Sequence, residues 1–362
     1  MRKTFMYVVV LGILAFGVYY FIVRKSDGVY SDSEAGFTIK DTANIGRIFI
    51  SVQGAESILL ERTANGWTLQ KQYVAQKSAI DGFLKMLNRQ SPLYPVPKSM
   101  HNHVVATLAG NGIKVELDDR QGKVMRVFYV GGETSDQKGT FMLVEGASRP
   151  YVVNLPNYQG TLSAFYTNKV LDWRDRTVFD VKPEDMESVS IKYPEHDLNS
   201  FTLKVANGKP IVIAHPDIMK MGALNLRRAS VFLKFFEKVS CEGYLIHFAG
   251  MDSILKSVPK HAEIDVHSIK GQSQHVDVYW MPLNRRSKNA NAPTEEIPDS
   301  KYDADRFFAV MNNFKDTVMI QSSVFDKIFR KSYEFYEADP AATGEPLKLL
   351  PEGSIKPKDK KK

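Results

Sequence analysis

The sequence predicts an α+β protein: an N-terminal transmembrane helix followed by two tandem, mainly antiparallel α+β modules of similar topology. Three features lead to this prediction. The chain opens with 20 uncharged residues, Thr4–Val23. Strand-like segments joined by Asn-Gly turns then follow, and Asn-Gly between alternating apolar residues is a strong hairpin signal. Finally, the same order of hairpins and helices occurs twice, which indicates an internal repeat.

The opening run is long enough to cross a bilayer. At ~1.5 Å per residue it spans ~30 Å, the thickness of the hydrocarbon core. The alternative, a cleaved signal peptide, has a shorter apolar core and small residues before the cleavage site, whereas this run ends in the bulky residues Tyr19–Val23. We therefore expect an uncleaved anchor. Its flanks, Arg2-Lys3 and Arg24-Lys25, carry equal charge, so the cytoplasmic N-terminus that we expect rests on the usual orientation of terminal anchors.

The charge of the chain is concentrated at its two ends. The net charge is +7, of which residues 1–25 and residues 356–362 contribute +4 each, so residues 26–355 carry −1. A nearly neutral body lacks the basic surface that a phosphate backbone requires, and no nucleic-acid partner is expected. The single cysteine, Cys241, excludes an intramolecular disulfide and a cysteine-based zinc site.

The internal repeat is visible in the spacing of matching residues. Phe-Leu-Lys occurs in both expected helices, at 83–85 and 232–234, and the turn glycines Gly122 and Gly271 are likewise 149 residues apart. The later strands, such as 141–144 and 307–310, are 166 apart. The extra 17 residues indicate a surface-loop insertion. Chance similarity of short amphipathic hairpins is the alternative to a repeat.

These observations predict six segments. They are a cytoplasmic start and anchor at 1–25, a tether at 26–36, a first α+β module at 37–170, an inter-module junction at 171–182, a second module at 183–340 with an insertion at 284–303, and a basic disordered tail at 341–362.

Several motifs together resemble a family of bacterial envelope proteins known only as a domain of unknown function. They are Asn65-Gly66-Trp67, Pro97–His103, Tyr129–Thr134, Gly139–Leu143, Tyr151–Asn154 and Asp172–Arg176. The resemblance covers residues 37–340, is closest in 37–180, and matches the second module in outline. It implies a single-pass anchor in the Gram-negative inner membrane, a periplasmic body, and related domains that accompany ABC-transporter auxiliary and gliding-type components. It supplies no catalytic residues.

The junction motif is the main candidate binding site. It consists of Asp172, Trp173, Arg174, Asp175 and Arg176. Two arginines and a tryptophan can grip a carboxylate, a sugar or a partner chain. The alternative is a structural clasp of ion pairs and stacked rings that fixes the angle between the modules.

A second candidate is a group of polar residues on one expected strand face. Glu263, Asp265 and His267 share that face, and His275 and Asp277 are expected to face them from the paired strand. Such a cluster can bind a divalent metal. A solvated sheet face is the simpler interpretation, and we predict no metal site.

Three other motifs are weaker candidates. His101-Asn102-His103 is similar to part of a metal nuclease motif, but Asn102 is better explained as a helix start. Gly131–Ser135 is similar to a phosphate-binding loop, but it lacks the Lys-Ser/Thr ending and is expected to form a turn between strands. Cys241 is expected to be a buried structural thiol rather than a nucleophile.

We therefore expect a non-enzymatic, membrane-anchored periplasmic subunit, scaffold or adaptor of an envelope complex. Its partners would be the inner membrane, through residues 4–23, and other envelope proteins, with no catalytic residues, cofactor or small-molecule ligand. The alternative is a periplasmic ligand-binding or hydrolytic module that uses a cleft between the two modules near Trp173.

Overall fold

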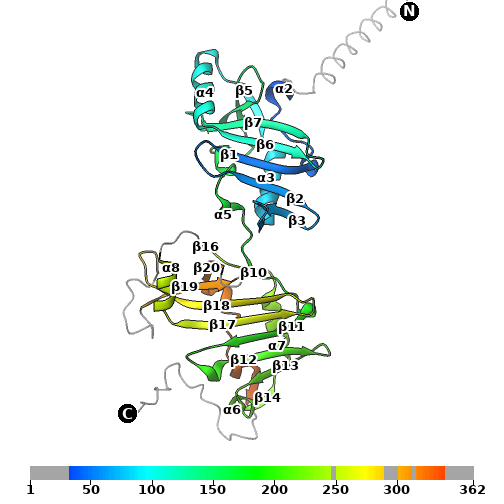
Figure 1. The fold of residues 1–362 in the computed structure, drawn as a ribbon, viewed down its shortest axis with the longest axis vertical. Helices are drawn as coiled ribbons and strands as arrows, with labels where there is room; N and C mark the ends of the chain where they lie inside the picture. Colours follow the sequence, from blue (N-terminus) through cyan, green and yellow to red (C-terminus); the bar gives the residue numbers. More distant parts are fainter. Residues whose placement is uncertain (1–31, 246–249, 289–300, 312–314, 339–362) are drawn as a thin grey trace, which may run out of the picture. The chain divides into compact units, whose positions relative to one another are not determined.

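The computed structural model describes residues 32–245, 250–288, 301–311 and 315–338 (Figure 1). The expected anchor and basic tail lie outside this range, as do most of the expected tether and insertion. Within it, no helix has the length and apolar character needed to span a membrane. The chain divides into two compact units, residues 1–175 (unit 1) and 176–362 (unit 2), and the division falls within the range expected for the junction.

Unit 1 is built on one nine-stranded sheet with the order β4-β3-β2-β1-β6-β7-β8-β9-β5. Every strand pair in it is antiparallel. The strands are β1 (Ile45–Val52), β2 (Ile58–Thr63), β3 (Gly66–Leu69), β4 (Tyr73–Val74), β5 (Ser91–Pro95), β6 (Ile113–Asp119), β7 (Val124–Glu133), β8 (Thr140–Val144) and β9 (Tyr151–Asn154). The helices are α2 (Asp32–Ala35), α3 (Lys77–Arg89), α4 (Lys98–Asn111) and α5 (Val170–Trp173), with short 3-10 turns at Thr42–Asn44 and Leu162–Phe165.

Unit 2 contains an eight-stranded antiparallel sheet with the order β13-β12-β11-β17-β18-β19-β20-β16 and two small two-stranded sheets, β10-β15 and β14-β21. The main strands are β11 (Met186–Lys192), β12 (Phe201–Ala206), β13 (Lys209–Ala214), β16 (Gly243–Tyr244), β17 (Lys260–Ser268), β18 (Ser273–Pro282), β19 (Tyr302–Met311) and β20 (Asp316–Gln321). The small sheets use β10 (Thr177–Phe179), β15 (Val239–Ser240), β14 (Gly222–Leu224) and β21 (Tyr336–Ala338). The helices are α6 (Pro216–Met219), α7 (Leu226–Leu233), α8 (Met251–Ser257) and α9 (Ser322–Phe325), with 3-10 turns at Pro183–Asp185, Asp197–Asn199, Lys234–Phe236 and Ser332–Phe335.

The two large sheets have equivalent strand orders. The order β3-β2-β1-β6-β7-β8-β9-β5 in unit 1 corresponds, strand by strand, to the order β13-β12-β11-β17-β18-β19-β20-β16 in unit 2. The helices correspond too, since α3 and α7 precede the edge strands β5 and β16, and α4 and α8 precede β6 and β17. The mixed α+β composition and the antiparallel sheets predicted from the sequence are thereby confirmed.

Each unit buries one face of its large sheet under a helix. In unit 1, Ile80, Phe83, Met86 and Leu87 of α3 join a core that includes Ile48 of β1. Leu84, the neighbour of Phe83 on α3, is half-buried and packs at the edge of this core. In unit 2, the equivalent helix α7 buries Ala229, Phe232 and Leu233 in a second core.

The opposite face of the unit 1 sheet is partly covered by α4. Val104 and Leu108 of this helix form a small separate cluster with Val152 of β9, and Tyr129 of β7 and Phe141 of β8 pack against it. Strand residues alternate between faces, so these side chains point away from the α3 core. Unit 1 therefore places helices on both sides of its sheet.

Two local predictions need correction. Asn102 does not start a helix, because α4 begins four residues earlier, at Lys98, directly after Pro97, whose fixed φ is compatible with a helix start. Gly131 and Gly132 do not form a turn, because they belong to the last part of β7, where the register with β8 shifts. The turn lies between Thr134 and Gly139, whose backbone groups are bonded, with Thr134 N–H donating to Gly139 C=O at 2.8 Å.

The range expected as a tether also ends in packed structure. Ala35 is 7% exposed and belongs to the unit 1 core. The Glu34 carboxylate accepts hydrogen bonds from the backbone N–H and the hydroxyl of Ser148, at 3.2 and 3.0 Å. The described part of residues 26–36 is thus attached to unit 1.

The close approach of β8 and β9 leads to a stability prediction. A Cβ atom on Gly139 would lie 2.5 Å from a Val152 methyl and 2.9 Å from the Val153 carbonyl oxygen, whereas nothing lies within 4 Å of a Cβ on Gly132. We expect Gly139→Ala to lower the free energy of unfolding of unit 1 by ~1–3 kcal/mol through overpacking. Gly132→Ala is the matched control and should change it by less than ~0.5 kcal/mol. Denaturant titration of both variants checks this, and equal effects would contradict it.

Candidate functional site

Four of the five predicted junction residues pack within unit 1. Trp173 is 2% exposed, its indole N–H donates to the Thr167 carbonyl at 3.0 Å, and its ring meets Phe83 edge-to-face at 5.2 Å. Arg174 is 5% exposed, and its guanidinium carbon lies 3.9 Å from the centre of the Tyr73 ring. The tryptophan is therefore part of the core of unit 1.

Backbone hydrogen bonds attach the same segment to β4 and its extension. Gln76 N–H donates to the Trp173 carbonyl at 2.7 Å, and Asp175 N–H donates to the Val74 carbonyl at 2.9 Å. Asp172 is exposed and accepts a hydrogen bond from the Thr167 hydroxyl at 2.6 Å. The segment closes the β4 edge of the sheet in unit 1.

Arg176, the fifth predicted residue, packs within unit 2. Its guanidinium donates to the backbone carbonyl of Glu242 at 3.1 Å, and its own carbonyl accepts from the N–H of Cys241 at 2.8 Å. The sequence motif is therefore divided between the two units.

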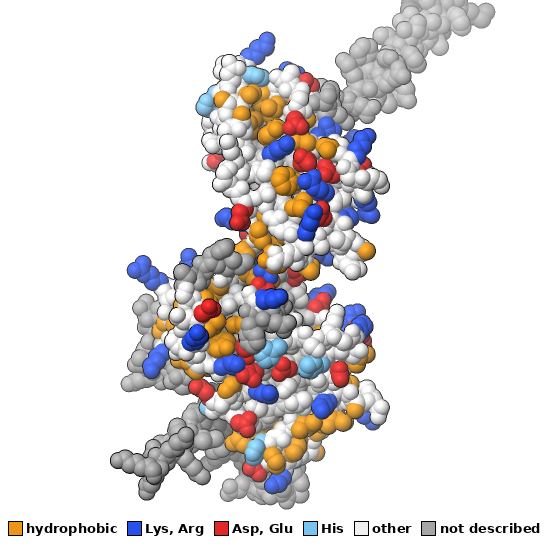
Figure 2. Space-filling model, in the orientation of Figure 1, with side chains coloured by type: hydrophobic (Ala, Val, Ile, Leu, Met, Phe, Trp, Pro, Cys, Tyr) orange, Lys and Arg blue, Asp and Glu red, His pale blue; other side chains and the backbone are white. Residues whose placement is uncertain are grey.

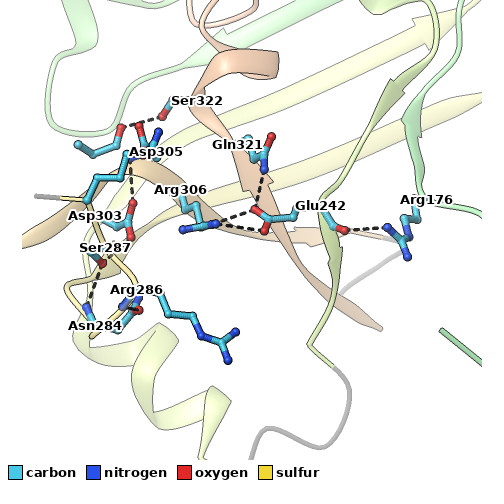
Figure 3. Close-up of polar contacts among 12 residues, drawn as sticks. Arg176, Glu242, Asn284, Arg286, Ser287, Asp303, Asp305, Arg306, Gln321 and Ser322 are labelled. Carbon is cyan, nitrogen blue, oxygen red and sulfur yellow. Dashed lines mark hydrogen bonds and ion pairs between the residues drawn. The ribbon is translucent and has the colours of Figure 1, made fainter. Parts of the chain in front are cut away.

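A polar cluster that the sequence did not predict surrounds Glu242 (Figure 3). Arg306 of β19 donates to both carboxylate oxygens of Glu242, at 2.9 and 3.3 Å, and Gln321 of β20 donates to one of them at 3.0 Å. The hydrogen bond from Arg306 is the main reason that the pKa of Glu242 lies below its usual value, with burial acting in the opposite direction. The three residues are separated by 64 and 15 positions, so no local pattern marks them.

A second polar group connects described residues near the two ends of the expected insertion. The Ser287 hydroxyl donates to the Asp303 carboxylate at 2.5 Å, and Asp303, 1% exposed, also accepts from the Asp305 N–H at 2.8 Å (Figure 3). The described residues on either side of the loop therefore meet at the base of β19.

The polar strand face of unit 2 is arranged as predicted. Glu263 and Asp265 of β17 lie opposite Asp277 and His275 of β18. Figure 2 shows acidic, basic and histidine side chains gathered over these two strands. The fifth predicted residue, His267, lies opposite Ser273 and shares a hydrogen bond of 2.9 Å with it.

The members of this face bind one another. His275 contacts Asp265 through Nδ1 at 2.6 Å and Asp277 through Nε2 at 3.2 Å, while Lys260 contacts Asp277 at 2.9 Å and Glu263 at 2.7 Å. Only a protonated imidazole can donate from both nitrogens. Among the described residues, no three His, Cys, Asp or Glu side chains are placed to hold a metal.

The same contacts shift the pKa values of two bases. Burial alone would lower the pKa of His275, but the hydrogen bond to Asp265 and the negative charges of Asp265 and Asp277 outweigh it and raise the pKa. Burial likewise acts to lower the pKa of Lys260, and its hydrogen bonds to Glu263 and Asp277 raise it overall. The acidic side chains of this face therefore favour the protonated form of His275.

An open concavity lies elsewhere in unit 2, beside α7. This groove has a volume of about 860 Å³, and it is lined by Met221, Asn225, Arg227, Arg228, Val231, Phe232, Phe235, Arg330, Tyr333, Glu334, Phe335 and Tyr336. Phe232 and Phe335 are buried and meet edge-to-face at 5.3 Å, which forms an aromatic floor. Arg227 and Arg228 are exposed at its rim.

The carboxylate of Glu334 in the groove accepts hydrogen bonds from neighbouring residues. Glu334 accepts from Arg330 at 3.0 Å and from the Lys331 N–H at 2.9 Å, and its carbonyl accepts from Arg228 at 3.1 Å. Arg227 stands one residue from Arg228 on α7. The groove lining thus contains three arginines and one carboxylate, which gives it a net positive charge.

The remaining candidates are surface or core residues. His103 is exposed and His101 half-buried on α4, and Cys241 is 5% exposed in the core of unit 2, so the prediction that it is buried is confirmed.

The molecule is thus an α+β protein of two tandem antiparallel units with equivalent sheets. Residues 67–245, just under half of the chain, match the family model described as "Domain of unknown function (DUF4340)", and the chain contains a domain of this family. The match begins in β3 of unit 1 and ends just after β16 of unit 2. The expected relation to an uncharacterised family is confirmed, over a shorter range than the 37–340 predicted. No curated protein and no solved structure matched the chain.

The packing of Arg174 leads to a prediction about the junction. We expect Arg174→Ala to destabilise unit 1 by ~2 kcal/mol, because a desolvated cation–π contact is lost and the aliphatic part of the side chain no longer packs. Arg174→Lys keeps the charge but not the planar group and should have an intermediate effect. Arg176→Ala should leave the melting of unit 1 unchanged. Thermal unfolding checks this; unchanged melting of Arg174→Ala combined with lost partner capture would instead indicate a partner grip.

The raised pKa of His275 leads to a pH prediction. The pKa in the folded chain lies above the ordinary value of 6.5, so protonation stabilises unit 2. This contribution is complete below pH 6.5 and is lost as the pH rises through the raised pKa. Melting temperatures measured across this range should fall with pH more steeply in the wild type than in His275→Gln. His267→Gln, which alters a histidine facing a serine, is the control and should retain the wild-type slope.

Proposed function

We propose that the protein is a non-enzymatic, membrane-anchored adaptor of the bacterial envelope, whose second unit binds an acidic segment of a partner protein in the groove beside α7. The groove is the observation that carries this proposal. The anchor, residues 4–23, is proposed from the sequence, and the periplasmic location and inner-membrane setting are proposed from the family resemblance.

The composition of the groove supports a protein partner. Tyrosine and arginine are enriched among the residues that dominate protein interfaces, and aromatic anchors in pockets are the usual centre of such sites. Here Tyr333 and Tyr336 line the groove together with the buried Phe232 and Phe335. The site offers apolar area at its floor and cations at its rim.

The charges of the groove support an acidic segment. Arg227 and Arg228 are neighbours at the exposed start of α7, and Glu334 already contacts Arg330. A guanidinium binds a carboxylate through two parallel hydrogen bonds, so an incoming Asp or Glu has a suitable partner at the rim. An apolar residue next to that acid would reach the aromatic floor.

Co-purification from native membranes tests the proposal. The full-length chain, extracted in mild detergent, should carry stoichiometric partner proteins with it. Arg227→Glu should reduce their recovery by about tenfold, equivalent to ~1.4 kcal/mol. Lys204→Glu makes the same charge change at an exposed position on β12 and is the matched control, which should leave recovery unchanged.

Two outcomes would contradict the proposal. If the wild-type protein is recovered alone in repeated preparations, it is not an adaptor of a stable complex. If partners are recovered equally with Arg227→Glu, they do not bind in the groove.

A further inference from the structure

We propose that the α4 end of unit 1 is a membrane-contacting surface that lies against the headgroups of an anionic bilayer. This inference rests on the anchor in the proposed function and adds to it a specific face of the protein. The surface consists of Leu93, Tyr94, Lys98, Met100 and Arg149, and we call it the α4 surface.

Exposed apolar side chains are concentrated there. Leu93, Tyr94 and Met100 are 37%, 42% and 39% exposed and lie within eight residues of the chain, on β5 and the first turn of α4. Figure 2 shows hydrophobic side chains beside histidine and Lys or Arg side chains at this end of unit 1. Tyrosine is favoured at the level of lipid headgroups because its ring is apolar and its hydroxyl is polar.

The charges of the α4 surface fit an anionic bilayer. Lys98 and Arg149 are exposed, and they line a small concavity with Glu34, Val96, His101 and Ser148. Glu34 is the one carboxylate in this group, and its oxygens accept hydrogen bonds from Ser148. Each Lys or Arg near an anionic leaflet contributes ~1 kcal/mol of attraction.

The same concavity lies beside the first described helix of the chain. Glu34 belongs to α2, the first described helix, so α2 lies beside Lys98 and His101 of α4. Figure 1 shows α2, β5 and α4 at the same end of unit 1. Val23, the last residue of the proposed anchor, precedes Asp32 by nine residues, which limits their separation to at most ~32 Å. We therefore expect the α4 surface to lie on the side of unit 1 that is nearer to the proposed anchor.

The edge strand β5 argues against a partner strand as the occupant. Among the described strands, β5 lies at the end of the sheet, next to β9. Pro92 and Pro95 have no N–H to donate, and prolines on edge strands prevent the addition of another strand. These prolines therefore favour a lipid surface over an added strand as the occupant.

Site-specific labelling of the full-length chain tests the inference. Cys241 is buried and is replaced by serine, so that a single new cysteine carries a fluorescent label. Tyr94→Cys reports on the α4 surface. Val124→Cys is the matched control, because Val124 is 54% exposed and starts β7, at the opposite end of that strand from Gly131, which adjoins Leu108 of α4. Both proteins are reconstituted in phosphatidylcholine–phosphatidylglycerol vesicles that contain a nitroxide-labelled lipid as quencher.

We expect the label at position 94 to lose at least about twice as much fluorescence as the label at position 124, because contact with the bilayer brings it near the quencher. Replacing both Lys98 and Arg149 by Glu should reduce this difference, and so should vesicles of phosphatidylcholine alone.

The outcomes separate the two proposals. If the protein floats with the vesicles but both labels are quenched equally, the α4 surface does not contact the bilayer, and the anchored adaptor stands without it. Quenching at position 94 that appears only after a partner protein is added would likewise overturn the lipid contact. If the wild-type protein does not float with the vesicles, residues 4–23 are not an anchor, and the proposed function fails first.

Discussion

Each unit depends on one long-range strand pairing. In unit 1, β1 pairs with β6, so that Ile48 lies opposite Leu117 and Ile50 opposite Val115, and all four side chains are fully buried. In unit 2, β11 pairs with β17 in the same way, with Val189 opposite Val266 and Ile191 opposite Ile264. Closing this pair costs loop entropy, because the chain between the two strands must return to its start. The intervening helices offset that cost by burying their apolar stripes on the sheet that the pairing creates.

The position of the helices follows from the same pairing. Helices α3 and α4 lie between β1 and β6 in the sequence, and they pack on opposite faces of the sheet, α3 on the main core and α4 on the smaller cluster of Val104, Leu108 and Val152. The amphipathic stripe of α3 is continuous, whereas α4 buries only two side chains. A helix that buries two side chains leaves most of its surface in solvent. This exposed surface of α4 can bind a lipid surface or another molecule.

The sequence predicted the elements whose signal is local. Asn-Gly turns, the shared Phe-Leu-Lys and the turn glycines marked the hairpins and helices, because turn geometry and helical periodicity are set within a few residues. The start of α4 was missed because no capping side chain marks it; Pro97 supplies only a favourable backbone angle. The cluster of Glu242, Arg306 and Gln321 was missed because residues of three separate segments of the chain create it, one just before β16 and the others in β19 and β20. The five junction residues were found as a motif, but the motif is split between the two units, with the boundary between Asp175 and Arg176. That boundary depends on partners far away in the sequence, which a local pattern does not reveal.

The two copies differ in elements that the strand pairing and the core do not require. The shared elements are those that the pairing and the core require. By contrast, α4 has 14 residues and its counterpart α8 has seven, and among the described residues the small sheet β14-β21 belongs to unit 2 without a counterpart in unit 1. The proposed α4 surface is built from the longer helix and its proline-containing edge strand, while the proposed groove includes Met221, which precedes β14, and Tyr336 of β21. Tyr336 also donates to the carbonyl of Val212 on edge strand β13, at 2.9 Å. Strand β21, which helps to form the groove, thereby also occupies a backbone acceptor of edge strand β13. An occupied acceptor makes the edge less open to unwanted strand pairing.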